Sequence, residues 1–147
     1  MTIRRTTLAW TAGLALVAAL PLAGRALRGR DGARCAMDGV TVDVLHAVRV
    51  EDADGTSRAL CCVDCAAAWV RNAPAAPRRI LVTGEDTGRE VEARSAWYVE
   101  SRVVAVRATG CYIHAFATRE AAERHAEEFR GELLTGDAAP FAPWRER

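Results

Sequence analysis

The feature that most limits how this chain can fold is an uncharged apolar run, residues 8–24, directly behind the basic start of the chain. Arg4 and Arg5 precede the run, and a basic segment followed by an apolar one is typical of an export signal or a membrane anchor. The run has the minimum length of a membrane-spanning helix. Arg25 stands where a lipoprotein signal carries its lipidated Cys, and no Ala-x-Ala cleavage site is present. We therefore predict an uncleaved anchor in the cytoplasmic membrane, with the globular part on the extracytoplasmic, periplasmic side.

The remaining chain is long enough for one small domain. Of the 147 residues, we assign residues 1–33 to the leader and an Arg/Gly-rich linker, residues 34–136 to a folded domain and residues 137–147 to a C-terminal tail. The net charge of +1 argues against a nucleic-acid-binding protein, which would show a clear basic excess. All the basic residues are Arg, which excludes lysine Schiff-base chemistry and a Lys-dependent phosphate loop.

Alternating and helical patterns in residues 34–136 predict an α+β fold: a small antiparallel sheet with two short helices, preceded by the hydrophobic leader or anchor helix. Asp64 is expected to cap a first helix through Arg71, and Thr118 a second helix through Phe129, with Gly131 ending it. The segments expected as strands are 40–50, 56–61, 79–83, 90–96, 98–108 and 112–116.

Three short cysteine-containing segments suggest the chemistry of the domain. Cys61 and Cys65 are four residues apart, so both thiols can face one side of a helix that begins at this point. Cys62 and Cys65 form a C-x-x-C pair, the spacing of a zinc knuckle or a redox dithiol. A structural disulfide between Cys61 and Cys65 is a further alternative. The five Cys of the chain cannot all be paired within one molecule, so at least one thiol is free or bound to a metal.

Sulfur ligands favour Cu(I), and a thioether beside a thiolate favours it over zinc. Cys35 and Met37 supply one of each, two residues apart. Cys111 and His114 open a late strand that is expected to lie beside the first helix. The candidate metal ligands are therefore Cys35, Met37, Cys61, Cys65, Cys111 and His114. The alternatives are that Met37 fills the core, that Cys111 is a small buried apolar residue, and that His114 is a buried strand residue.

Several segments, taken in their order along the chain, resemble the NosL family of copper-binding proteins. They are Cys35-Ala-Met37-Asp38, Leu60-Cys61-Cys62-Val-Asp64-Cys65, Ala96-Trp-Tyr-Val99, Gly110-Cys111, Ala115-Phe116 and the helix before Arg130-Gly131. The resemblance spans residues 34 to 136. This sequence departs from the family pattern at three positions: Arg25 replaces the lipidated Cys, Cys62 replaces a Ser, and Cys111 replaces a Met.

The resemblance implies an exported copper chaperone with a fold related to that of organomercurial lyase, serving assembly of a copper enzyme such as nitrous oxide reductase. Its partners would be the copper-receiving enzyme or its assembly factors. We therefore expect a Cu(I)-binding accessory protein rather than an enzyme, with Cys62 dispensable for metal binding. The alternatives are an extracytoplasmic zinc or soft-metal module, an organomercurial-lyase-like enzyme using Cys61, Asp64 and Cys111, and a thiol-disulfide enzyme using Cys62 and Cys65.

Overall fold

The structure is a computed structural model that describes residues 32–145 except residue 108. The apolar run 8–24, predicted as the anchor, lies outside these residues. Within the described part of the chain, no helix is both long and apolar enough to cross a membrane. Residues 33–147 form one compact unit, and the following description concerns that unit.

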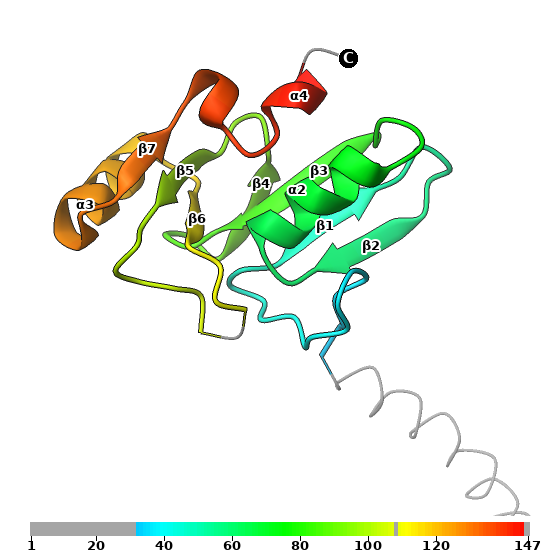
Figure 1. The fold of residues 1–147 in the computed structure, drawn as a ribbon, viewed down its shortest axis with the longest axis horizontal. Coiled ribbons are helices and arrows are strands. Elements are labelled where there is room, and N and C mark those ends of the chain that lie inside the picture. Colours follow the sequence, from blue (N-terminus) through cyan, green and yellow to red (C-terminus); the bar gives the residue numbers. More distant parts are fainter. Residues whose placement is uncertain (1–31, 108, 146–147) are drawn as a thin grey trace, which may run out of the picture. The chain divides into compact units, whose positions relative to one another are not determined.

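The unit has an α+β fold, as the sequence predicts, with its strands divided between two antiparallel sheets (Figure 1). The first sheet has the strand order β2-β1-β3-β4 and the second the order β6-β5-β7. In chain order, the elements are β1 (Val48–Glu51), β2 (Ser57–Leu60), α2 (Val63–Asn72), β3 (Arg79–Gly84), β4 (Arg89–Glu92), β5 (Trp97–Glu100), β6 (Ile113–Phe116), α3 (Arg119–Phe129), β7 (Glu132–Leu134), the 3-10 turn η1 (Gly136–Ala138) and α4 (Ala142–Arg145).

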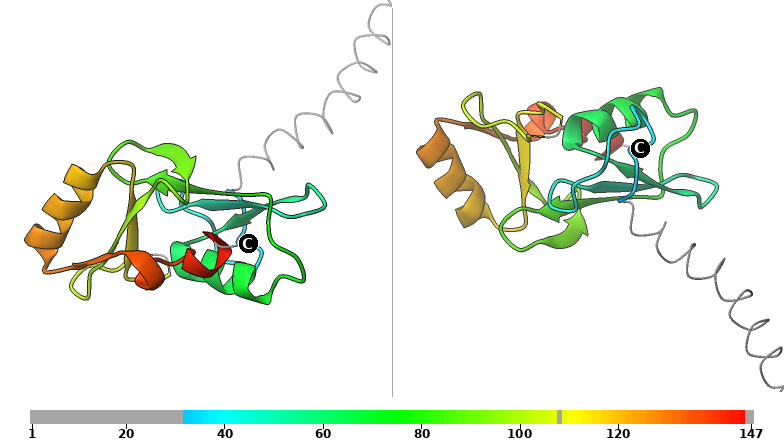
Figure 2. Two further views of the ribbon diagram at one scale, coloured as in Figure 1. Left: turned by 90° about the horizontal axis from the view of Figure 1, so that it is seen from above. Right: turned by 90° about the horizontal axis from the view of Figure 1, so that it is seen from below.

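Helix α2 covers one face of the first sheet (Figures 1 and 2). Alternate residues of the strands point toward it, including Val48, Val50, Ile80 and Val82, and all four are buried. The opposite face carries ion pairs such as Arg49–Glu90. The alternation in β1 is the pattern of a sheet that is buried on one side, whereas β3 is also buried on its other face, at Leu81 and Thr83.

The second sheet is covered on both faces. Tyr98 and Ala115 point toward α2 and the first sheet, whereas Val99 and Phe116 point toward α3. Thr118 caps α3 as predicted, with its hydroxyl oxygen accepting the backbone N–H of Ala121. Such a bond satisfies one of the N–H groups that have no partner within the helix.

The C-terminal segment, expected as a tail, packs against the core. Phe141 and Trp144 are both buried. Phe141 makes an edge-on ring contact with Tyr98, and the indole N–H of Trp144 donates to the carbonyl oxygen of Pro77 at 3.2 Å. These two aromatic residues join α4 to the end of the first sheet and to β5.

The first predicted strand, residues 40–50, is shorter than expected: β1 begins at Val48. The preceding residues form turns because aspartate side chains bind backbone N–H groups that a strand would pair with its neighbour. The carboxylate of Asp38 accepts the N–H of Val40, and that of Asp43 accepts the N–H of Leu45, each at 3.0 Å. Such bonds to the residue two positions on favour turns over strands.

Candidate metal centre

The structure brings three of the predicted ligands together with an aspartate. The Sγ atoms of Cys35, Cys61 and Cys65 and a carboxylate oxygen of Asp38 all lie within 4.8 Å of one another. Two segments far apart in the sequence supply these atoms, namely the turn after residue 34 and the junction between β2 and α2. Four ligand atoms at these separations can surround a single metal ion.

The turn that carries Cys35 and Asp38 is fixed by backbone hydrogen bonds. The N–H of Cys35 donates to Val40 and the N–H of Gly39 donates back to Cys35, at 2.8 and 2.9 Å. The N–H of Ala36 donates to Ala59 of β2 at 2.9 Å, which holds the turn against the first sheet. Gly39 has a φ of +75°, a conformation that glycine adopts without steric cost. The turn therefore presents both side chains to the end of β2.

Cys61 and Cys65 lie on one side of the start of α2, as their spacing predicts. Their Sγ atoms are 3.5 Å apart, and they lie 3.5 and 3.3 Å from the Oδ2 atom of Asp38. The helix begins two residues earlier than predicted, with Cys62 in place of Asp64 as its N-cap and Asp64 inside the first turn. Starting the helix at Val63 places Cys61 in the extended segment that leads into it.

The four groups differ in their access to solvent. Cys35 and Cys61 are buried, Cys65 is half-buried and Asp38 is exposed. A metal bound here would thus be held from inside by two enclosed sulfurs. It would face solvent on the side of Cys65 and Asp38, where an incoming ligand can approach.

Electrostatics keep the carboxylate charged and two of the thiols protonated when no metal is bound. The N–H of Val40 and the thiol of Cys35 lower the pKa of Asp38 to about 2. Burial, above all, raises the pKa of Cys61 and of Cys65. A metal must therefore displace protons from these sulfurs, so its affinity will rise with pH.

Cys111, another predicted ligand, does not join the cluster. It is buried, as is Cys62. The Cys111 thiol donates to the carbonyl oxygen of Ile113 at 3.6 Å. Interaction between the Cys111 and Cys62 thiols lowers the pKa of Cys62 to about 5 and raises that of Cys111. Cys111 precedes β6, which begins at Ile113, and it is not part of the thiol cluster.

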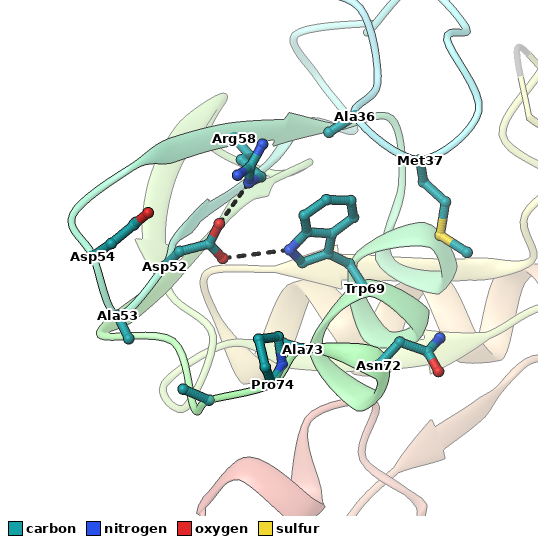
Figure 3. A pocket seen from close by; sticks show the side chains of 11 residues that line it. Ala36, Met37, Asp52, Ala53, Asp54, Arg58, Trp69, Asn72, Ala73 and Pro74 are labelled. Atoms are coloured by element: carbon teal, nitrogen blue, oxygen red, sulfur yellow. Dashed lines mark hydrogen bonds and ion pairs between the residues drawn. The ribbon is translucent and has the colours of Figure 1, made fainter.

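Met37 lies between two residues of the cluster in the sequence, and its side chain is 48% exposed. It lines a cavity of about 570 Å³, where it stands beside the Trp69 ring (Figure 3). On the other side of that ring, Asp52 accepts the indole N–H of Trp69 and pairs with Arg58. The Met37 thioether is thus available from solvent at the border between the thiol cluster and this cavity.

His114, the remaining predicted ligand, belongs to a different cluster. Its Nδ1 atom lies 3.0 and 3.1 Å from the two carboxylate oxygens of Glu85, and its Nε2 atom lies 3.2 Å from the carbonyl oxygen of Val104. His46 approaches the same carboxylate at 3.3 Å, and the His125 ring stacks on His114. All three histidines of the chain therefore gather around Glu85.

Asp38 is not among the ligands predicted from the sequence, although it belongs to the segment Cys35-Ala-Met37-Asp38. An Asp followed by a Gly is typical of a turn. The Asp38 carboxylate does stabilise that turn by accepting the N–H of Val40. The available signal was its place three residues after Cys35. A turn of this length returns the side chain to the same side as the cysteine.

The fold and the cluster define a class, an α+β domain with a sulfur-rich site at a strand-to-helix junction. Neither the known protein-family models nor the curated proteins match the sequence. Among solved structures, the chain is similar to the copper chaperone NosL from Shewanella denitrificans, with a TM-score of 0.62 and 16% sequence identity. The likeness covers 70% of this chain and 86% of that one. The predicted resemblance to NosL is confirmed in the fold.

Proposed function

We propose that this protein binds Cu(I) and delivers it to a copper enzyme, as an accessory protein rather than as an enzyme. The observation that carries the proposal is the group of three cysteine sulfurs and one carboxylate within 4.8 Å, on a fold shared with a copper chaperone. Thiolates are the ligands that Cu(I) prefers. Cys35, Cys61 and Cys65 would hold the copper.

The exposure of the ligands suits copper as cargo. Buried Cys35 and Cys61 retain the ion, whereas half-buried Cys65 is accessible to a competing thiol or thioether. Met37 stands on the exposed side of the same turn and can act as a neutral, weak ligand during exchange. Copper then leaves by replacement of one ligand at a time, without passing through water as a free ion.

The sequence, rather than the folded domain, supports the proposed cellular location and the enzyme that receives the copper. The run at residues 8–24 behind Arg4 and Arg5 supports a periplasmic domain anchored in the cytoplasmic membrane. We propose as partner an extracytoplasmic copper-receiving enzyme, such as nitrous oxide reductase, or its assembly factors.

Titration of the reduced protein with Cu(I) against a competing chelator tests the proposal. We expect one Cu(I) per chain. Cys61→Ser and Cys65→Ser should each lower the affinity more than about 100-fold, because even groups outside the ligand set change metal affinity 10- to 100-fold. Cys62→Ser is the matched control and should leave the stoichiometry unchanged. Absence of a chelator-competitive Cu(I) site, or loss of copper in the control with retention in Cys61→Ser, would contradict the proposal.

Asp38 favours a second candidate function, stable zinc binding. Three thiolates and one carboxylate make the four ligands of a closed tetrahedral zinc site, whereas Cu(I) is satisfied by the three sulfurs. Asp38→Ala distinguishes the two functions. If copper is the cargo, the Cu(I) affinity should fall by about 10- to 100-fold, the range for a group outside the ligand set, and copper should still bind. If zinc is the natural metal, Cu(I) should fail to displace bound zinc in a competition titration. Asp38→Ala should then abolish zinc binding.

A further inference from the structure

A cavity of about 570 Å³ opens beside α2, next to the thiol cluster (Figure 3). Trp69 lines it and lies on α2 one turn after Cys65, and residues four apart in a helix share a face. The turn that supplies Cys35 and Asp38 to the cluster also supplies Met37 to the cavity. The cavity and the proposed copper site therefore share one helix face and one turn.

The walls of the cavity are largely apolar. The Met37 thioether stands beside the Trp69 ring (Figure 3). Small apolar residues line much of the rest, namely Ala36, Ala53, Ala73, Pro74 and Ala75. The volume lies in the range of cavities that enclose ligands, and Trp and Met are both enriched where proteins bind one another. An apolar side chain of a partner protein can therefore be buried here.

Across the Trp69 ring from the thioether, the polar groups leave a negative charge at the surface (Figure 3). Asp52 accepts the indole N–H of Trp69 at 3.4 Å and pairs with Arg58 at 2.5 Å, so its charge is compensated. Asp54 is exposed, and its Oδ1 atom accepts the backbone N–H of Thr56 at 2.8 Å. Such a bond fixes the carboxylate without neutralising it.

The proposed copper site adds negative charge at the other end of the cavity. Three thiolates around one Cu(I) leave two negative charges, and the exposed carboxylate of Asp38 adds a third. Arg34 offsets one of them, since its Nη1 atom donates to the carbonyl of Gly39 in the same turn at 3.1 Å. The loaded protein would thus be anionic at both ends of an apolar cavity. Charge complementarity favours a positively charged occupant.

We propose that this cavity receives a positively charged segment of the copper-accepting protein, with a methionine of that segment seated against Trp69. The inference rests on the proposed copper delivery and names the chemistry of the partner. Methionine meets both conditions of the site, because its sulfur packs well against aromatic rings and its thioether is a ligand for Cu(I). Basic residues beside the methionine would face the carboxylates of Asp54 and Asp38.

Docking at this position would bring an acceptor ligand to the exposed side of the copper. One helical turn, about 5.4 Å, separates Trp69 from Cys65 along α2, so a seated methionine needs a short movement to reach the ion. Buried Cys35 and Cys61 would still hold the copper when the acceptor thioether binds. Copper keeps its oxidation state throughout, and each cysteine sulfur that releases it takes up a proton from water.

NMR titration of the reduced, copper-free, full-length protein in detergent tests the docking separately from metal binding. The probe is a short capped peptide with one methionine between lysines. The signal is the indole N–H of Trp69, which is assigned by its loss in Trp69→Phe. We expect this signal to shift. A peptide with norleucine in place of methionine should bind about two- to tenfold more weakly, because it lacks the sulfur–aromatic contact. A peptide with glutamates in place of the lysines should also bind more weakly.

Substitutions at exposed positions test the cavity without disturbing the core. Ala75→Phe fills the cavity from the exposed loop after α2 and should weaken binding of the lysine peptide by about tenfold or more, through a steric clash. Ala138→Phe, at an exposed alanine of η1 outside the cavity, is its matched control. Asp54→Asn should weaken binding about two- to fivefold, as for an exposed ion pair, whereas Asp137→Asn on η1 should leave it unchanged.

Three results would overturn the inference. They are a Trp69 signal that no peptide shifts, equal binding of the lysine peptide by wild type and Ala75→Phe, and a shift that depends on protein concentration without peptide. The last result would make a second copy of this chain the occupant. All three are measured without copper, so the copper proposal would still be decided by its own titration. Failure of that titration with peptide binding retained would remove copper delivery and leave the binding surface.

Discussion

Replacing Glu85 with glutamine removes a half-buried charge that joins the two sheets. Glu85 follows β3, and its carboxylate lies 3.0 and 3.1 Å from the Nδ1 atom of His114 on β6. The exposed fractions of the two side chains are 16% and 3%. We expect Glu85→Gln to lower the free energy of unfolding by an amount that depends on pH, because the glutamine amide keeps the shape of the carboxylate and loses its charge.

The size of the effect follows from the pKa of Glu85. Burial alone would raise this pKa, but the hydrogen bonds of His114 and the nearby His46 ring, 3.3 Å away, lower it from 4.5 to about 2. At about 1.4 kcal/mol per pKa unit, this corresponds to about 3 kcal/mol of stabilisation when the carboxylate is charged. The glutamine retains one acceptor, whose hydrogen bond contributes about 1 kcal/mol. We therefore expect a loss of about 2 kcal/mol near pH 5.5.

The sign of the pH dependence follows from His114. Burial lowers its pKa, but the hydrogen bond and the charge of Glu85 outweigh burial and raise it above 6.5. Its contribution to stability is therefore complete below pH 6.5 and is lost as the pH rises through the raised pKa. The contribution of Glu85 is complete above pH 4.5 and is lost as the pH falls toward 2. The pair stabilises most between these limits, and the loss in Glu85→Gln should decrease to about 1 kcal/mol or less by pH 9.

Urea denaturation of wild type and variant at pH 5.5 and pH 9, with reductant present, measures this difference. Taking the difference at each pH removes the part of the opposing effect of His125 that comes from burial, which is the main cause of its lowered pKa. Glu90→Gln is the matched control, since Glu90 pairs with Arg49 at the surface, where such pairs contribute less than about 1 kcal/mol. Equal losses for Glu85→Gln at the two pH values would refute the argument.

Three further substitutions test how the second sheet is held. Gly131→Ala should destabilise the protein by about 1–3 kcal/mol in urea denaturation, because a Cβ there would lie 2.6 Å from a methyl carbon of Val99. Thr118→Ala should cost about 1 kcal/mol through loss of the α3 cap, measured by the same method. Tyr98→Phe should lower the free energy of unfolding by about 1–3 kcal/mol, because the buried carbonyl of Ala93 loses its 2.9 Å hydrogen bond.

The sequence predicts the helices of this fold better than its strands. Helix α3 runs from its predicted cap at Thr118 to Phe129, as expected, because cap chemistry and a 3.6-residue period are local signals. The strands end earlier than predicted where backbone groups find other partners. After Glu100, for example, the N–H of Ser101 donates to the carbonyl of Tyr112, and the described residues between them, 102–107 and 109–111, lie in neither a helix nor a strand. The division of the strands into two sheets depends on contacts between distant residues, which alternation along one segment does not encode.

The positions of the metal ligands also depend partly on local spacing and partly on contacts between distant residues. The pairing of Cys61 with Cys65 follows from helical spacing and is observed. The separation of Cys111 from this pair does not follow from spacing. The N-cap position of Cys62 keeps Cys61 in the extended segment that leads into the helix. A shift of the helix start by one or two residues is within the ordinary uncertainty of a helix boundary, yet here it decides which sulfur joins the cluster.

The start of α2 also directs the vicinal sulfurs to different neighbours. Cys61 and Cys62 both precede the first helical residue, Val63, and Cys62 has extended backbone angles, φ −164° and ψ 171°. Successive side chains of an extended backbone point to opposite sides, so Cys61 reaches the turn of Cys35 and Asp38 while Cys62 does not. A Ser at position 62, the residue that the NosL pattern carries there, should therefore leave the metal ligands unchanged.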